Sequence, residues 1–171
     1  DLAQAPTLED FKDPLPDRLQ LSDALPRALR RYVVRRDDHK SIIAGYPGFL
    51  DWGRDTLIAL RGIIAAGMQN EAQDILLQFA KYEENGTLPN MIRGNDVSNR
   101  DTSDAPLWFF VAAGDYMEQN GDEILQADCG NGRTLLEVMN SIFTNYVKGT
   151  PNGIRMDESS KLVYSPAHFT W

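Results

Sequence analysis

The sequence predicts an all-α protein whose helices form an incomplete ring of two layers. Two observations carry this prediction. Apolar residues recur at helical spacing in five segments, whereas strand-like stretches are short and few. Segments with one apolar face also alternate along the chain with segments that are apolar on nearly every side. A helix with one apolar face suits an outer layer, and a helix apolar all round contacts neighbours on both sides. Outer and inner helices are therefore expected to alternate.

The first predicted helix spans residues 24–36 and follows an irregular, proline-containing lead-in over residues 1–23. Leu25, Leu29 and Tyr32 share one face of this helix, and arginines cover the opposite face, which we interpret as solvated. The loop after it, residues 37–53, contains several glycines and is expected to hold a short strand over residues 41–44.

The remaining predicted helices differ in how much polar surface they carry. Residues 54–67 and 103–119 are apolar almost all round, whereas residues 70–84 and 133–148 are amphipathic, with Gln78 expected on a polar face. The loop over residues 85–102 is too long for a simple connection, and loops of this size are often functional. The chain is then predicted to end as a loop with a small hairpin over residues 149–171.

The bulk composition excludes several classes of function. The net charge of −8 argues against nucleic-acid binding, because phosphates need a basic face. No apolar run reaches the length of a membrane span, and the first residues lack the features of a signal peptide. A single cysteine, Cys129, excludes an internal disulfide and favours a reducing, cytoplasmic location. No spacing of metal ligands or phosphate-binding glycines is present, so no metal or cofactor is expected.

Both segments that are apolar all round are entered through loops rich in charged and aromatic residues. Inner helices of a two-layer ring point the same way, so these loops are expected to meet at one end of the ring. This brings together Trp52, Arg54, Asp55, Asp104 and Trp171, the last of which would lead into a further inner helix. Aromatic rings cover the apolar face of a pyranose, and fixed charged groups bind its hydroxyls. The set therefore suits a sugar.

Each of these residues also has a structural interpretation. Asp55 and Asp104 stand where an acidic side chain complements a helix N-terminus, so either is equally explained as a cap. Trp52 is also compatible with a place in the core, and Arg54 with a simple ion pair to Asp55. Asp51 and Asp101 are interpreted as solvated or loop-ordering residues. Spacing alone leaves these alternatives open.

Several motifs, in one order along the chain, resemble the amylo-α-1,6-glucosidase domain of glycogen debranching enzymes. They are SIIAGYPGFLDWGRDTLIALRG at residues 41–62, GTLPN at 86–90, Asp104-Ala105 with aromatic residues after it, and the stretch from Gly153-Ile154 to Phe169-Thr170-Trp171. The resemblance covers about residues 24–171. It implies an (α/α)₆ toroid and hydrolysis, with inversion, of the α-1,6-linked glucose stub left at a branch of glycogen.

The resemblance also implies roles for individual residues. Asp104 matches the general acid, Arg54 and Asp55 match the pair that grips the terminal glucose, and Trp52 would wall that subsite. The sequence departs from the family pattern at Gly48, where bacterial members usually carry tryptophan. It also reads Asn-Arg-Asp-Thr-Ser before Asp104 instead of the commoner Asn-Thr-Val, so Asp101 competes for the acid role.

The second carboxylate that glycoside hydrolysis needs is not evident in this sequence. Asp157 and Glu158 are predicted to lie in an exposed turn, and the resemblance places the base beyond Trp171. Residues 24–171 are thus expected to be the leading part of a catalytic domain, inactive alone and prone to self-association through apolar helix faces. The expected partner is glycogen or another branched α-glucan. Two rival functions stay open: another enzyme on the same toroid, such as a phosphorylase or an α-glucosidase, and a non-catalytic glucan-binding or assembly module.

Overall fold

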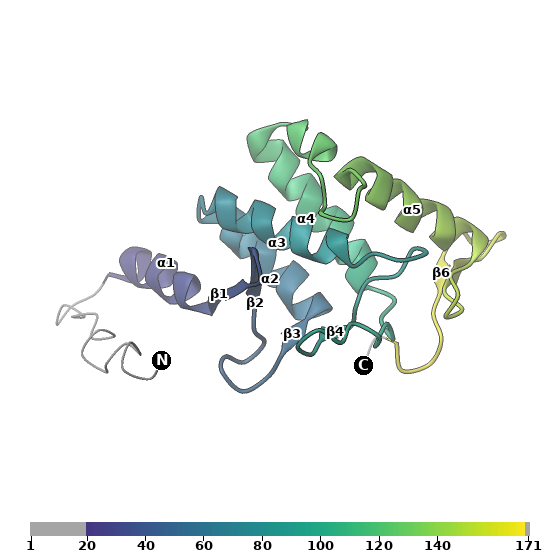
Figure 1. The fold of residues 1–171 in the computed structure, drawn as a ribbon, viewed down its shortest axis with the longest axis horizontal. Helices are drawn as coiled ribbons and strands as arrows, with labels where there is room; N and C mark the ends of the chain where they lie inside the picture. The colour runs from purple at the N-terminus through teal and green to yellow at the C-terminus, as the bar shows by residue number, and fades with distance from the viewer. Residues whose placement is uncertain (1–19, 170–171) are drawn as a thin grey trace.

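The computed structural model describes residues 20–169, and this part of the chain is mostly helical (Figure 1). Its α-helices are α1 (Leu21–Tyr32), α2 (Gly53–Ala65), α3 (Gln69–Lys81), α4 (Ala105–Asn120) and α5 (Leu135–Lys148), with a 3₁₀ helix η2 (Glu123–Gln126). Short strands pair antiparallel: β1 (Val33–Arg36) with β2 (His39–Ile42), β3 (Asp51–Trp52) with β4 (Met91–Ile92), and β5 (Arg155–Met156) with β6 (Val163–Tyr164). The chain is therefore of the predicted all-α class.

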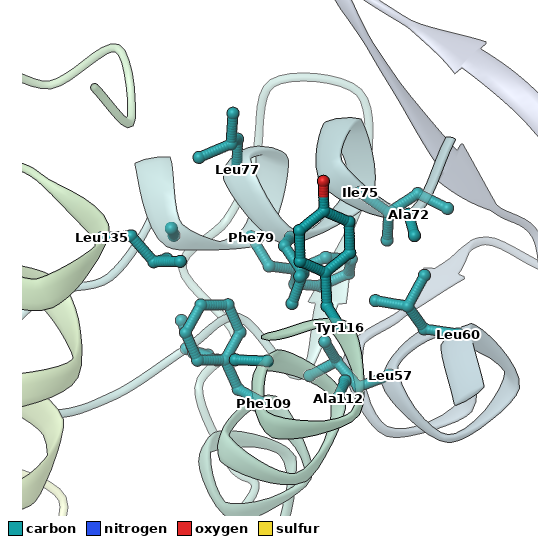
Figure 2. Close-up of a cluster of buried hydrophobic side chains, with 14 of the residues drawn as sticks. Leu57, Leu60, Ala72, Ile75, Leu77, Phe79, Phe109, Ala112, Tyr116 and Leu135 are labelled. Atoms are coloured by element: carbon teal, nitrogen blue, oxygen red, sulfur yellow. The ribbon is translucent and has the colours of Figure 1, made fainter. Parts of the chain in front are cut away.

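The hydrophobic core lies where α2, α3 and α4 pack together, with α5 closing one side (Figure 2). Leu57 from α2, Phe79 from α3, Phe109 from α4 and Leu135 from α5 are all fully buried in it. Each such side chain contributes about 1.5–3 kcal/mol by leaving water. The same contacts hold α2 and α4 side by side, which fixes the relative position of the loops that precede them.

The first predicted helix is wrong at both ends. Residues 21–23 belong to α1, which ends at Tyr32, and residues 33–36 form β1 instead of helix. Val33 and Val34 are β-branched and pair with β2 across a two-residue turn in which Asp37 has a φ of 52°. The predicted strand over residues 41–44 begins earlier, at His39. The predicted lead-in over residues 1–19 lies outside the described residues.

The later helices begin and end for recognisable reasons. Pro106 occupies the first turn of α4, where its missing N–H costs no intrahelical bond, and α4 stops at Gly121 with a φ of 84°. Helix α5 starts with a capping box, because Thr134 accepts from the Glu137 N–H and the Glu137 carboxylate accepts from the Thr134 N–H. The predicted start at residue 133 was thus two residues early.

The loops that precede α2 and α4 lie at the same side of the molecule, next to β3 and β4 (Figure 1). Both helices keep part of their surface exposed: Ile58 on α2 and Leu107 and Val111 on α4 are each 40% exposed. The prediction that these helices are covered on most sides thus holds only for their core-facing residues. Within residues 20–169, no helix combines the length and apolarity needed to cross a bilayer.

Helix α3 differs from its prediction in one respect. Gln78, expected on a polar face, is fully buried, and neither atom of its amide has a hydrogen-bond partner among the described residues. The stripe of Ile75, Leu76 and Phe79 is buried as expected. Helix α3 is therefore enclosed on more of its circumference than its sequence pattern indicates.

Candidate functional site

A cavity of about 440 Å³ opens beside the loops that precede α2 and α4. Its walls come from segments far apart in the sequence: the loop before β3, the start of α2, the loop around β4, the loop before α4 and the end of the described chain. The lining residues are Ala44, Phe49, Trp52, Arg54, Asp55, Asn90, Asp101, His168 and Phe169. Trp52, Arg54, Asp55 and Asp101, all singled out in the sequence, thus share one concave surface.

Trp52 is fixed in the cavity wall by the pairing of β3 with β4. It stands opposite Met91 in this ribbon, and the next residue, Gly53, donates its N–H to the Asn90 carbonyl at 2.9 Å. A Cβ at Gly53 would lie 2.6 Å from the Pro89 carbonyl oxygen, so only glycine fits there. The glycine of the WGRD motif therefore lets α2 begin directly against the β4 loop.

Asp51 was interpreted from the sequence as either solvated or loop-ordering, and in the structure it orders the loop. Its side chain is only 4% exposed and receives two guanidinium contacts from Arg36, at 2.6 Å from Nε and 3.3 Å from Nη2. This hydrogen bond raises the pKa of Arg36, and Arg36 Nη1 also donates to the Gly94 carbonyl at 3.0 Å. One arginine thus ties β1, β3 and the loop after β4 together behind Trp52.

Arg54 and Asp104 connect the first turn of α2 to the start of α4. The Arg54 Nε atom lies 2.6 Å from Asp104 Oδ2, and Nη2 donates to Oδ1 at 3.0 Å. The Nη2 contact is a charge-assisted hydrogen bond, and the Nε contact is a close ion pair without hydrogen-bond geometry. Arg54 lines the cavity, whereas Asp104 is not among the lining residues and is connected to the cavity only through Arg54.

Asp104 does not cap α4 through a hydrogen bond. Asp104 stands at the N-cap position of α4, but its side chain makes no capping hydrogen bond. Thr102 Oγ1 instead accepts from the Ala105 N–H at 3.3 Å and itself donates to Asp104 Oδ1 at 3.1 Å. The carboxylate is thus turned away from the helix end and towards Arg54.

Ser103, directly before Asp104, is held by three contacts from later parts of the chain. Its N–H donates to the Phe169 carbonyl at 3.1 Å, its carbonyl accepts from the Tyr146 hydroxyl at 2.8 Å, and its Oγ lies 2.8 Å from Ser165 Oγ. Burial raises the pKa of Tyr146, and the nearby charge of Asp104 adds to that effect. The backbone that carries Asp104 is thereby fixed from two sides.

Arg100 holds the same loop from behind. Its guanidinium donates to the carbonyls of Thr87 and Tyr82 at 3.0 and 2.8 Å, and its own carbonyl accepts from Asn152 at 2.8 Å. Burial lowers the pKa of Arg100. The long loop over residues 85–102 is thus a bonded structure and not a loose connection, as the further pairing of Asn90 with Asn99 also indicates.

Asp55 and Asp101 are the carboxylates that face the cavity most openly. Asp55 lies in the first turn of α2, where its charge complements the helix N-terminus, and is exposed. Asp101 is also exposed, and within residues 20–169 its carboxylate has no hydrogen-bond or ion-pair partner. Both side chains are therefore placed to bind hydroxyl groups of a ligand.

The comparison with known proteins identifies the family. A family model described as amylo-alpha-1,6-glucosidase matches residues 27–171. The chain belongs to the amylo-alpha-1,6-glucosidase family. A glycogen debranching enzyme of Saccharomyces cerevisiae is 35% identical over 102 residues, which cover 55% of this chain. The match spans only 7% of the length of that enzyme.

In this amylo-alpha-1,6-glucosidase family member, the cavity also contains residues that sequence reasoning missed. Phe49, Asn90, His168 and Phe169 line it. A signal existed for Phe49, an aromatic residue in a glycine-rich loop beside the WGRD motif, whereas a lone histidine such as His168 carries no comparable signal. Trp171, the remaining predicted site residue, lies outside the described residues.

Asp157 does not line the cavity. Asp157 accepts hydrogen bonds from the hydroxyls of Ser159 and Ser160 in the turn between β5 and β6, and these bonds lower its pKa. The predicted exposed turn is therefore confirmed. No group of histidine, cysteine or carboxylate side chains within residues 20–169 has the arrangement of a metal site.

Proposed function

We propose that this domain hydrolyses the α-1,6-linked glucose stub at a branch of an α-glucan such as glycogen. The observation that carries the proposal is the cavity that gathers Trp52, Arg54, Asp55 and Asp101, with Asp104 bound to the lining residue Arg54. Family membership supports the same reaction class. An indole face with charged groups around it matches a pyranose, which has apolar C–H faces and a rim of hydroxyls.

The cavity is of a size that suits a small ligand, because pockets for small molecules hold roughly 300–1,000 Å³. In the proposed complex, Trp52 covers one face of the terminal glucose. Arg54 and Asp55 bind its hydroxyls, and Asp101 and the Asn90 side chain add further polar contacts. Fixed donors and acceptors at the rim of the ring would orient the glycosidic bond towards Asp104.

Asp104 is proposed as the general acid, with Asp101 as the alternative. An acid must carry a proton, and the contacts with Arg54 occupy both carboxylate oxygens of Asp104. Arg54 faces the cavity, so a bound glucose would compete with Asp104 for the guanidinium. Sugar binding thus would release one oxygen of Asp104 for protonation. Inverting hydrolysis also needs a base about 6.5–9.5 Å from the acid, and we propose that it comes from outside these 171 residues.

The (α/α)₆ toroid is proposed on similar grounds. Helices α2 and α4 lie side by side with their preceding loops at one side of the molecule, as adjacent inner helices of a toroid would. Their exposed residues Ile58, Leu107 and Val111 are the positions that further helices of a ring would cover. On this proposal, residues 24–171 form the leading part of the domain.

The isolated 171-residue chain is expected to self-associate. The exposed apolar side chains of α2 and α4 would gain free energy by leaving water, about 25 cal/mol per Å² of buried surface. Sedimentation velocity over a range of concentrations measures this, and I58K/V111K should restore a monomer. A monomeric wild-type chain at high concentration would contradict the prediction.

The proposed activity is tested on the complete protein with a 6-O-α-glucosyl maltooligosaccharide. We expect free glucose as the product, released first as the β-anomer, which proton NMR detects before mutarotation. The isolated 171-residue chain is expected to release none, because the proposed base lies outside it. Dependence of turnover on inorganic phosphate would instead indicate a phosphorylase, and glucan binding without glucose release would indicate a binding module.

A further inference from the structure

Phe49 is an exposed aromatic residue on the wall of the candidate site. Its side chain is 64% exposed, yet it lines the cavity together with Trp52 and Arg54. A large apolar side chain normally leaves water by packing into the core, and among the described residues few are as exposed. Because this one faces a concave surface with charged groups, a ligand that covers its ring would gain contact area.

The loop that carries Phe49 holds the ring in place before any ligand binds. The loop is closed by a hydrogen bond from the Ala44 N–H to the Leu50 carbonyl at 3.1 Å, and inside it the Gly48 N–H donates to the Gly45 carbonyl at 2.8 Å. The ring lies over Gly45, where a Cβ would stand 2.8 Å from Phe49 Cδ2. A ring positioned in advance loses little conformational entropy when a ligand stacks on it.

Phe49 and Trp52 differ in depth. Trp52 is half-buried between β4 and the start of α2, next to the charged residues Arg54 and Asp55, whereas Phe49 is mostly exposed on a loop. The glucose that is cleaved would occupy the part of the cavity beside Trp52 and Arg54, which are both less exposed than Phe49. The polymer to which that glucose is attached must leave the cavity at its exposed side, where Phe49 lies.

We propose that Phe49 stacks on a sugar of the leaving α-1,4-linked chain and so selects for a glucan over a small leaving group. The inference rests on the proposed glucosidase function. It adds an outer subsite, recognised through the apolar face of a glucose unit, to the charged subsite for the cleaved residue. Gly45 contributes to this outer subsite, because a residue without a Cβ leaves room for the Phe49 ring.

The test compares two substrates in the complete protein: a 6-O-α-glucosyl maltooligosaccharide and α-glucosyl fluoride. The fluoride carries the same glucose but no leaving-group sugar. Phe49→Ala is expected to lower kcat/KM for the oligosaccharide about tenfold, the scale of removing one aromatic anchor, and to leave kcat/KM for the fluoride unchanged. Phe49→Tyr and Phe49→Trp keep a flat ring and should retain the oligosaccharide rate.

Two further variants control for trivial effects. Phe143→Ala removes a phenylalanine that is also 64% exposed, but on α5 and not in the cavity, and should change neither rate. Gly45→Ala should reproduce Phe49→Ala, because the added methyl group displaces the ring. A Phe49→Ala enzyme with an unchanged oligosaccharide rate, or with equal losses on both substrates, would overturn the outer subsite. A wild-type enzyme that hydrolyses neither substrate would overturn the glucosidase function itself, and with it this inference.

Discussion

Asp104→Asn in the complete protein is expected to reduce glucose release from a 6-O-α-glucosyl maltooligosaccharide by about 10²–10⁴-fold, the range of a lost general acid. Asparagine has nearly the same shape as aspartate but has no acidic proton to transfer to the leaving oxygen. The loss should fall on kcat, because the glucose would still contact Trp52 and Asp55. Initial rates by glucose oxidase assay, with KM measured separately, give the required separation.

The same variant should lose much less activity on α-glucosyl fluoride, because fluoride leaves without strong acid assistance. This second substrate separates an acid from a residue that only shapes the cavity. Asp101→Asn, measured in parallel, decides between the two candidate acids. If Asp101→Asn shows the large, substrate-dependent loss and Asp104→Asn does not, the acid role belongs to Asp101.

A matched control exists for the structural part of the Asp104 effect. Arg61 on α2 and Asp115 on α4 form an ion pair with the same Nε–Oδ2 distance, 2.6 Å, as Arg54 and Asp104. Asp115→Asn breaks a second link between these two helices outside the cavity. Arg61 is half-exposed, so this change should cost little stability and no activity. An equal loss of activity in both variants would contradict a catalytic role for Asp104.

Glu83→Ala is expected to lower the free energy of unfolding by about 3–5 kcal/mol, the cost of breaking a buried ion pair. The Glu83 side chain has no exposed surface, pairs with Arg133 and accepts hydrogen bonds from the Gly86 N–H and the Ser141 hydroxyl. Its loss leaves the buried Gly86 N–H and the part-buried donors of Ser141 and Arg133 without this acceptor. Urea unfolding followed by circular dichroism measures the change.

Glu84→Ala is the control for this prediction. Glu84 is the next residue, but its side chain is 69% exposed and lies 3.6 Å from Arg100, so its removal should cost less than about 1 kcal/mol. A Glu83→Ala protein that unfolds at the same urea concentration as Glu84→Ala would show that the buried cluster contributes no net stability. Arg133→Ala leaves the Glu83 carboxylate buried and without its ion-pair partner. Comparing its free energy of unfolding with that of Glu83→Ala shows which of the two losses destabilises the protein more.

The helices were predictable from sequence because their apolar spacing is regular. The stripes in α3 and α5 and the apolar bodies of α2 and α4 are all present, within a few residues at their ends. The pattern failed where local backbone preferences decide. In the sequence, Val33 and Val34 continue the apolar face of the first helix. In the structure they form a strand, because the turn at Asp37 lets β2 pair with them. The 3₁₀ helix η2 was also missed, since four residues hold too little periodicity to detect.

The sequence predicted several of the residues that line the candidate site, but not which ion pairs and hydrogen bonds they form. The motifs identified Trp52, Arg54, Asp55 and Asp101, and the structure gathers them in one cavity. Sequence spacing placed Arg54 beside Asp55, whereas the fold pairs Arg54 with Asp104, 50 residues later. Contacts of this kind depend on tertiary packing, so no local pattern contains them. The same holds for Asp51, whose partner Arg36 precedes it by 15 residues.

The three contacts on Ser103 also set an order of assembly during protein synthesis. The core of α2, α3 and α4 uses residues that leave the ribosome before residue 121. Ser165, in contrast, follows Ser103 by 62 positions, and Phe169 comes later still. At about 5–20 residues per second, the ribosome needs roughly 3–12 s to add those positions. The backbone around Asp104 therefore gains its last supporting contacts only after the core helices have been synthesised.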